Sequence, residues 1–204
     1  MLTVEKIGGT SMSQFKDVLN NIIIGKRSGA EMYNRIFVVS AYNNVTNWLL
    51  EHKKTGAPGI YVKFLNDDNY EAALDELCQK LIALNRDYEE IKLDQKVADE
   101  FIINRIEKAK SFLRSMHNVL ASGYVDRKDL YLAAREILSS IGEAHSAFNS
   151  VNIIKNNGIN AKFIDLCGFD DSEALTIDQR IHKAFEGIDF SKTLCVATGY
   201  TKGT

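Results

Sequence analysis

The sequence has little proline and cysteine, and it lacks any long apolar run. Three cysteines, Cys78, Cys167 and Cys195, lie far apart and form no CxxC pair, so neither a disulfide framework nor a zinc site is predicted. A reducing, cytoplasmic location is expected. No segment approaches the roughly 20 apolar residues of a membrane span. Glu5 and Lys6 interrupt the first apolar run, which argues against a secretory signal.

The net charge is also small, because basic and acidic residues are nearly equal in number. The 204 residues include 25 Lys and Arg against 27 Asp and Glu, for a net charge of −2. A protein that binds nucleic acid usually concentrates basic residues on one face, so no nucleic-acid partner is expected. With 45% hydrophobic residues, the chain is expected to form one globular core.

Four short runs rich in β-branched and aromatic residues predict strands buried in a parallel sheet. They span residues 2–8, 35–41, 160–166 and 192–199. Between the first two, a helix is predicted from about Ser13 to Gly25, where glycine is placed to end it. This alternation predicts a three-layer α/β/α sandwich with a mainly parallel sheet.

The middle of the chain, from about residue 70 to 157, is predicted to be a helical excursion. Apolar residues recur with helical spacing from Ala98 to Leu120, and the stripe restarts at Leu130 after the break "SGYVDRKD" at 122–129. Gly142 is expected to interrupt the second helix. The only proline, in "APG" at 57–59, predicts a loop.

The stretch "EKIGGTS" at 5–11 carries the strongest local signal. A strand that runs into Gly8 and Gly9, with Thr10 and Ser11 at a helix start, offers backbone N–H groups, hydroxyls and a helix dipole to an anion. Lys6 is placed to reach the same anion. The order of residues matches neither GxxxxGK[ST] nor GxGxxG. The alternative is a tight turn whose N-cap is Ser11 or Ser13.

Four motifs in order resemble those of the aspartokinases, members of the amino acid kinase family. "VEKIGGTSM" resembles their first strand and phosphate loop, and "VVSAYNNVTNWLL" at 38–50 their second strand and following loop. "LSSIGEAHSA" at 138–147 resembles the Gly-Glu motif, and "VATGY" at 196–200 the Val-Thr-Gly-Phe segment. The residues that occupy these motifs are most similar to those of the aspartokinase branch that feeds ectoine synthesis.

This resemblance implies transfer of the ATP γ-phosphoryl to the side-chain carboxylate of L-aspartate, giving 4-phospho-L-aspartate, with ATP and magnesium required. Lys6 would stabilise the transferring phosphoryl, and Gly8, Gly9, Thr10 and Ser11 would surround it. The aspartate would contact Ser40, Thr46, Glu143 and Tyr200, the last of which stands where phenylalanine is usual.

Other residues are given structural interpretations. A glutamate such as Glu143 in the first turn of a helix is favoured by the dipole alone. His145 has no counterpart in the family motif and is interpreted as packed or solvated. Asp165, Asp170 and Asp171 are interpreted as surface acids rather than magnesium ligands, so no metal site is predicted.

The sequence also departs from the family. Aspartokinases continue from Thr-Gly-Phe into Arg-Gly-Gly-Ser-Asp, whereas this sequence stops at "TGYTKGT". Residues 1–204 are therefore expected to be the N-terminal, amino-acid-binding part of the catalytic domain, without the nucleotide half or regulatory domains, and inactive alone. The alternatives are a non-catalytic module that binds an amino acid or anion, and a kinase for glutamate or N-acetylglutamate. A homo-oligomer remains open.

Overall fold

The computed structural model describes residues 1–171 and 173–202, and a four-stranded parallel sheet lies at its centre. The strands, in the spatial order β1-β2-β4-β3, are β1 (Thr3–Ile7), β2 (Arg35–Val39), β4 (Leu194–Thr198) and β3 (Ala161–Ile164). Each coincides with one of the predicted strands, which confirms them. Because all four run in parallel, their carboxyl ends meet along one edge.

The helices are longest in the middle of the chain, as predicted. There they are α5 (Tyr70–Arg86), α6 (Gln95–Ser122) and α7 (Arg127–Asn156), with the short 3₁₀ turn η3 (Glu89–Ile91) after α5. Shorter helices, which the sequence analysis did not predict, are α3 (Val45–Leu49), α4 (Ile60–Leu65) and α8 (Ile177–Phe185). The crossover from β1 to β2 contains α1 (Gly9–Met12), α2 (Phe15–Asp17), the π-helical η1 (Val18–Ile24) and the 3₁₀ turn η2 (Gly29–Met32).

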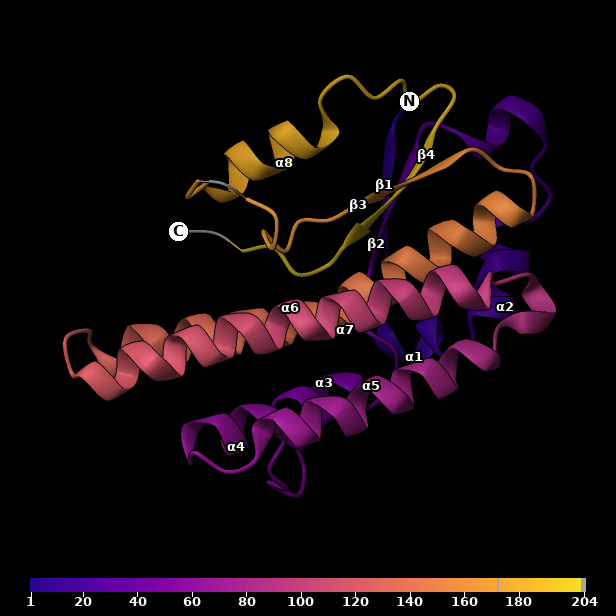
Figure 1. The fold of residues 1–204 in the computed structure, drawn as a ribbon. Coiled ribbons are helices and arrows are strands. Elements are labelled where there is room, and N and C mark those ends of the chain that lie inside the picture. Colours follow the sequence, from indigo (N-terminus) through magenta and orange to yellow (C-terminus); the bar gives the residue numbers. More distant parts are fainter. Residues whose placement is uncertain (172, 203–204) are drawn as a thin grey trace.

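The sheet is covered on both faces, which confirms the three-layer sandwich. On one face Phe37 and Val196 pack into the large core that includes α7 and η1. On the other face Ile36, Ile164 and Cys195 form a smaller cluster with the α8 segment. Figure 1 shows α8 on the opposite side of the sheet from α6 and α7. None of the described helices is long and apolar enough to cross a membrane.

The first crossover differs from the single helix predicted over 13–25. Helical structure begins already at Gly9, and it is divided into α1, α2 and the wider turns of η1. Arg35, buried beside η1, donates hydrogen bonds to the carbonyls of Ile22 (2.9 Å) and Ile23 (2.7 Å), and so satisfies acceptors at the end of η1. Gly25 ends the helix at a positive φ of 57°, as predicted.

The predicted break at Gly142 is wrong, because α7 continues through it. A Cβ at position 142 would lie 2.8 Å from both the Ala41 Cβ and the Val45 Cγ1. Glycine is therefore required for the close approach of α7 to the segment after β2, and it serves packing rather than helix termination. The break between α6 and α7 is confirmed, with Gly123 in the left-handed region and Asp126 as N-cap.

Candidate active site

Three of the four sequence motifs meet at the carboxyl edge of the sheet. The Ser40 N–H donates to the Ile7 carbonyl (3.0 Å), which joins the end of β2 to the end of β1. The Gly199 N–H donates to the Val39 carbonyl (2.9 Å), which joins the end of β4 to the same place. In parallel α/β sheets, ligands commonly bind outside the carboxyl ends of the strands.

The fourth motif reaches this edge from α7. Glu143 lies beneath the end of β4, where a Cβ at Gly199 would be 3.2 Å from the Glu143 Oε2. One turn further along α7, the Ser146 hydroxyl donates to the Ser40 carbonyl (2.8 Å). Glu143 stands in the interior of a long helix, so its interpretation as a first-turn residue favoured by the dipole is wrong. Its carboxylate is held at the site by packing.

The surroundings of Glu143 favour its protonated form. Burial raises the pKa of Glu143 to about 7, against the opposing influence of the Tyr200 backbone N–H and the Lys6 ammonium. Its Oε2 is buried and accepts no hydrogen bond from a described residue. A buried carboxylate oxygen without a donor is suited to receive one from a ligand, and a ligand ammonium would restore the ionised form.

The residues predicted to bind phosphate line the turn after β1. Lys6, Thr10 and Ser11 are exposed, and their side chains form no hydrogen bond or ion pair among the described residues. Gly8 is the N-cap of α1, so the prediction of Ser11 or Ser13 as N-cap is wrong. The Ser13 hydroxyl instead accepts the Asn43 N–H (2.8 Å), which ties this turn to the segment after β2.

Thr46 and Tyr200 border the site less directly. Thr46 is exposed in the first turn of α3, next to Val45, whose side chain packs against Gly142. Tyr200 is half-buried, its carbonyl accepts the Thr198 hydroxyl (2.8 Å), and burial raises its pKa. The structure therefore brings Lys6, Ser40, Glu143 and Tyr200 to one edge, but no contact joins the Thr46 side chain to them.

Two stacked tyrosines support the site from below. The Tyr88 hydroxyl donates to the Met12 carbonyl (3.3 Å) in α1. The ring of Tyr42, two residues after Ser40, stacks on Tyr88 with centroids 5.2 Å apart. The two loops that carry the candidate phosphate and substrate contacts thus rest on the same aromatic pair.

A buried polar cluster adjoins these rings. The Asn85 Nδ2 donates to Asp99 (2.7 Å), which leaves the Asn85 Oδ1 as acceptor for the His145 Nε2 and the Asn149 Nδ2, both at 2.7 Å. Burial lowers the pKa of His145 to about 3, so this side chain is neutral near pH 7. The interpretation of His145 as a packed residue is confirmed.

The acidic residues after β3 are engaged in ion pairs. Asp165 pairs with the buried Arg105 (2.8 Å), Asp171 with the buried Arg180, and Asp170 with Lys108. Within residues 1–171 and 173–202, no group of three or more His, Cys, Asp or Glu side chains is arranged to hold a metal ion. These acids fasten the loop to the helices on either side.

Sequence reasoning missed the residues that hold the motifs together. Ser146, Ser13 and Tyr88 each bond to the backbone of a distant segment. Serine and tyrosine at these positions follow no recognisable spacing. Only the positions of Ser146, inside the Gly-Glu motif, and of Ser13, directly after the first motif, offer a signal.

The fold can be placed by comparison with solved structures. The chain is similar to Escherichia coli aspartokinase III in complex with lysine and aspartate, with a TM-score of 0.54, 19% identity, and coverage of 97% of this chain and 40% of that one. The complex of the same enzyme with aspartate and ADP gives a TM-score of 0.52 and 19% identity, with the same coverage. The chain therefore has the amino acid kinase fold.

Its sequence is similar to one particular kinase. The aspartate kinase Ask_Ect of Stutzerimonas stutzeri (strain A1501) is 46% identical over 98% of this chain. The match spans 43% of the length of that relative, so this chain corresponds to less than half of it. No family model matches the chain. The resemblance to the aspartokinases is confirmed.

Proposed function

We propose that this chain is the N-terminal, amino-acid-binding part of an aspartate kinase. The whole enzyme would transfer the γ-phosphoryl of ATP to the side-chain carboxylate of L-aspartate and form 4-phospho-L-aspartate. The observation that carries the proposal is the position of Glu143, which lies half-buried beneath the end of β4, with its Oε2 buried and without a hydrogen-bond partner among the described residues. The identity of 46% to an aspartate kinase supports the same conclusion.

In this proposal, Glu143 binds the ammonium of aspartate. The hydroxyls of Ser40 and Thr46 contact the α-carboxylate, and Tyr200 closes the site beside β4. An ammonium at Glu143 would stabilise the ionised carboxylate in a place where burial otherwise disfavours it. The substrate is thereby oriented with its side-chain carboxylate toward the turn after β1.

The chemistry requires position and charge neutralisation rather than a general base, since a carboxylate is already a nucleophile. Lys6 supplies a positive charge for the transferring phosphoryl. The backbone and hydroxyl donors of Gly8, Gly9, Thr10 and Ser11 surround its oxygens. The Lys6 ammonium also lowers the pKa of Glu143. The proposed phosphoryl-binding group and the proposed ammonium-binding group therefore interact electrostatically.

ATP belongs to the proposal as phosphoryl donor, and magnesium belongs to it as the resemblance to the aspartokinases implies, although no group of three or more His, Cys, Asp or Glu side chains among the described residues is arranged to hold it. The proposal includes a cytoplasmic location and a place in the ectoine branch of the aspartokinases, with which the name Ask_Ect of the relative agrees. It also includes a homo-oligomeric state, which remains to be measured.

The test is a titration of the chain with L-aspartate, followed by NMR. We expect saturable shifts at Gly199, Ser40 and Glu143, and at least tenfold weaker binding by Glu143→Gln, because the amide cannot pair with the ammonium. Glu186→Gln, on the exposed surface after α8, serves as the matched control.

Titration with L-glutamate and N-acetyl-L-glutamate separates the alternative kinases. Tighter binding of either one than of L-aspartate would transfer the assignment to that substrate. Absence of aspartate shifts at the strand ends would refute the placement of the amino acid at Glu143.

A further inference from the structure

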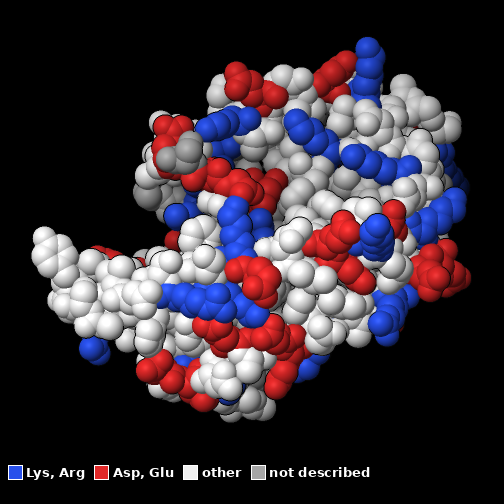
Figure 2. Space-filling view, in the orientation of Figure 1, with Lys and Arg blue, Asp and Glu red and all other residues white. Residues whose placement is uncertain are grey.

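A cavity that Glu143 does not line lies between the α6–α7 hairpin and the loop after β3. Its volume is about 250 Å³, slightly below the roughly 300–1,000 Å³ typical of ligand pockets, so it suits a small molecule. Figure 2 shows the surface hollowed between the hairpin and the lobe that holds α8. The proposed aspartate site does not use this space.

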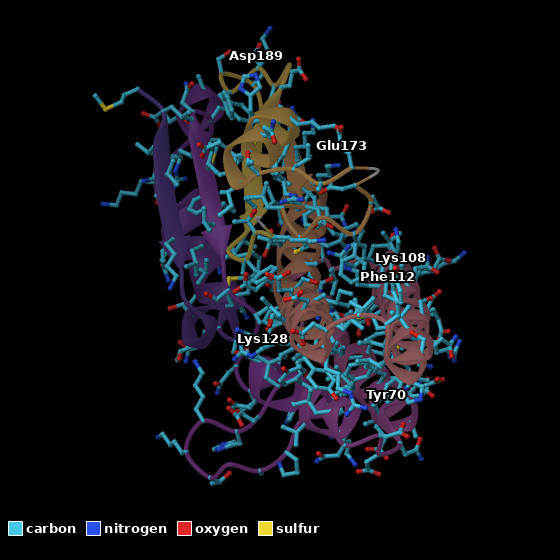
Figure 3. The ribbon with its side chains drawn as sticks, turned by 90° about the vertical axis from the view of Figure 1, so that its left-hand side faces the viewer. Tyr70, Lys108, Phe112, Lys128, Glu173 and Asp189 are labelled. Atoms are coloured by element: carbon cyan, nitrogen blue, oxygen red, sulfur yellow. The ribbon has the colours of Figure 1, made fainter. Side chains whose placement is uncertain are left out.

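The apolar part of the cavity wall comes from three elements. Phe112 and Met116 line it from α6, Ile137 from α7, and Phe169 from the loop. The rings of Phe112 and Phe169 meet edge to face, with centroids 5.7 Å apart. Figure 3 shows Phe112 beside Lys108 on α6. Such walls favour an apolar ligand body.

The same cavity carries two opposite charges that lack protein partners. Glu136 on α7 and Lys202 after β4 both line it, and neither forms an ion pair with a described residue. The other acid in the lining, Asp171, is already paired with Arg180. The cavity thus offers one carboxylate and one ammonium to a ligand.

The loop wall is fastened in place, so the cavity does not need to be formed by the ligand. The guanidinium of Arg105 lies 4.0 Å from the centre of the Phe169 ring and pairs with Asp165. Lys108 of α6 pairs with Asp170 in the same loop. A preformed site loses less ordering entropy on binding.

We propose that this cavity binds a small zwitterion with an apolar body, the chemistry of an apolar α-amino acid. Its ammonium pairs with Glu136, its carboxylate pairs with Lys202, and its side chain lies between Phe112, Met116 and Phe169. The inference does not depend on the proposed kinase function. Glu136 lies about two helical turns from Glu143 on α7, and Cys167 in the cavity lining contacts the Tyr200 carbonyl (4.0 Å), so the cavity adjoins the proposed aspartate site without including Glu143.

The experiment titrates the chain with L-leucine and with two analogues that share its carbon skeleton. 3-Methylbutylamine lacks the carboxylate, and 4-methylpentanoate lacks the ammonium. We expect saturable NMR shifts at Met116 and Phe169 with L-leucine, and binding weaker by on the order of tenfold with each analogue, because one charge-assisted contact is lost.

Two variants assign the charges. Glu136→Gln is expected to weaken the binding of L-leucine by about tenfold, so that L-leucine no longer binds more tightly than 4-methylpentanoate. Lys202→Met is expected to remove the advantage of L-leucine over 3-methylbutylamine. The control variants Glu186→Gln and Lys192→Met, both exposed outside the cavity, retain wild-type binding.

Three results would overturn the inference. They are absence of saturable shifts with L-leucine, unchanged discrimination in Glu136→Gln, and shifts centred on Gly199 rather than Met116. The last would place L-leucine in the proposed aspartate site. A Glu143→Gln variant that binds L-leucine as the wild type does would separate the two sites, so this test and that of the proposed function fail independently.

Discussion

At the scale of single residues, one edge of the sheet carries both the half-buried carboxyl group of Glu143 and the exposed ammonium group of Lys6. Burial holds the pKa of Glu143 near 7, while the Lys6 side chain remains in solvent. Their different surroundings lead to separate expectations, one for stability and one for catalysis.

The raised pKa of Glu143 predicts a pH-dependent stability. The folded protein retains the proton up to about pH 7, whereas the unfolded chain loses it near 4.5, so the free energy of unfolding contributed by Glu143 falls as the pH rises through this window. Relative to Glu143→Gln, the wild type is expected to lose on the order of 2–3 kcal/mol between pH 4.5 and pH 8.

Urea unfolding of both proteins at several pH values measures this difference. His145, whose lowered pKa gives a slope of opposite sign, contributes equally to both and cancels. Parallel pH profiles for wild type and Glu143→Gln would contradict the buried state of this carboxyl.

Lys6→Met in the whole enzyme tests the proposed phosphate role. Methionine keeps an apolar stem but removes the ammonium, so we expect kcat to fall by on the order of a hundredfold or more, with a smaller change in KM for aspartate. Because Lys6 is exposed at the end of β1, the melting temperature should change little. Lys16→Met, on the exposed side of α2, is the control. Near-normal kcat in a folded Lys6→Met enzyme would refute the phosphate role and show that residues 5–11 form only a structural turn.

At the scale of elements, α7 links the packing of the core to the site. It carries Gly142 against α3, Glu143 under the strand ends, and His145 and Asn149 in the buried polar cluster. The residues of α7 that pack in the core therefore alternate with Glu143 within two helical turns. A small displacement of α7 would move Glu143 by the same amount.

Gly142→Ala is expected to destabilise the protein despite the better helix propensity of alanine. The propensity gain is roughly 1 kcal/mol, whereas forcing a methyl group into a packed interface costs about 1–3 kcal/mol. The new Cβ would lie 2.8 Å from atoms of Ala41 and Val45. We expect a net loss on the order of 1 kcal/mol in urea unfolding, with NMR shifts in residues 40–46.

Ser115→Ala, on the exposed face of α6, provides the matched control and should change the free energy of unfolding by a few tenths of a kcal/mol. A more stable Gly142→Ala protein would show that α7 and α3 separate without cost.

At the scale of the whole molecule, the chain holds the proposed amino-acid site and matches 43% of the length of its aspartate kinase relative. Phosphoryl transfer needs nucleotide, substrate and charge-neutralising groups assembled together. In the proposed reaction, the described residues supply Glu143, Lys6 and the turn after β1, which are only part of this assembly.

We therefore expect this chain alone to bind L-aspartate without catalysing its phosphorylation. Trapping of the acyl phosphate as a hydroxamate measures the reaction, and the whole enzyme is the positive control. Hydroxamate that depends on both L-aspartate and ATP would show that residues 1–204 suffice for catalysis.

The sequence by itself determined the layers of the fold and the order of the motifs. β-Branched runs and helical stripes are local patterns, so the four strands and the helices between residues 70 and 157 followed from them. The turn after Lys6 and the glutamate after Gly142 were recognised as motifs through their resemblance to the aspartokinases. Short helices such as α3, with five residues, carry too few periods to be recognised.

The tertiary structure alone decided the surroundings of Gly142 and Glu143. Gly142 resembles a helix terminator in sequence, but its lack of a side chain is used for contact with Ala41 and Val45. Glu143 resembles a solvated first-turn acid, but parallel strand ends and α7 enclose it and raise its pKa to about 7. Both outcomes depend on segments far apart in the sequence, roughly 100 residues for Gly142 and Ala41 and roughly 55 for Glu143 and Gly199, whose approach is set by packing and leaves no periodic trace in the sequence.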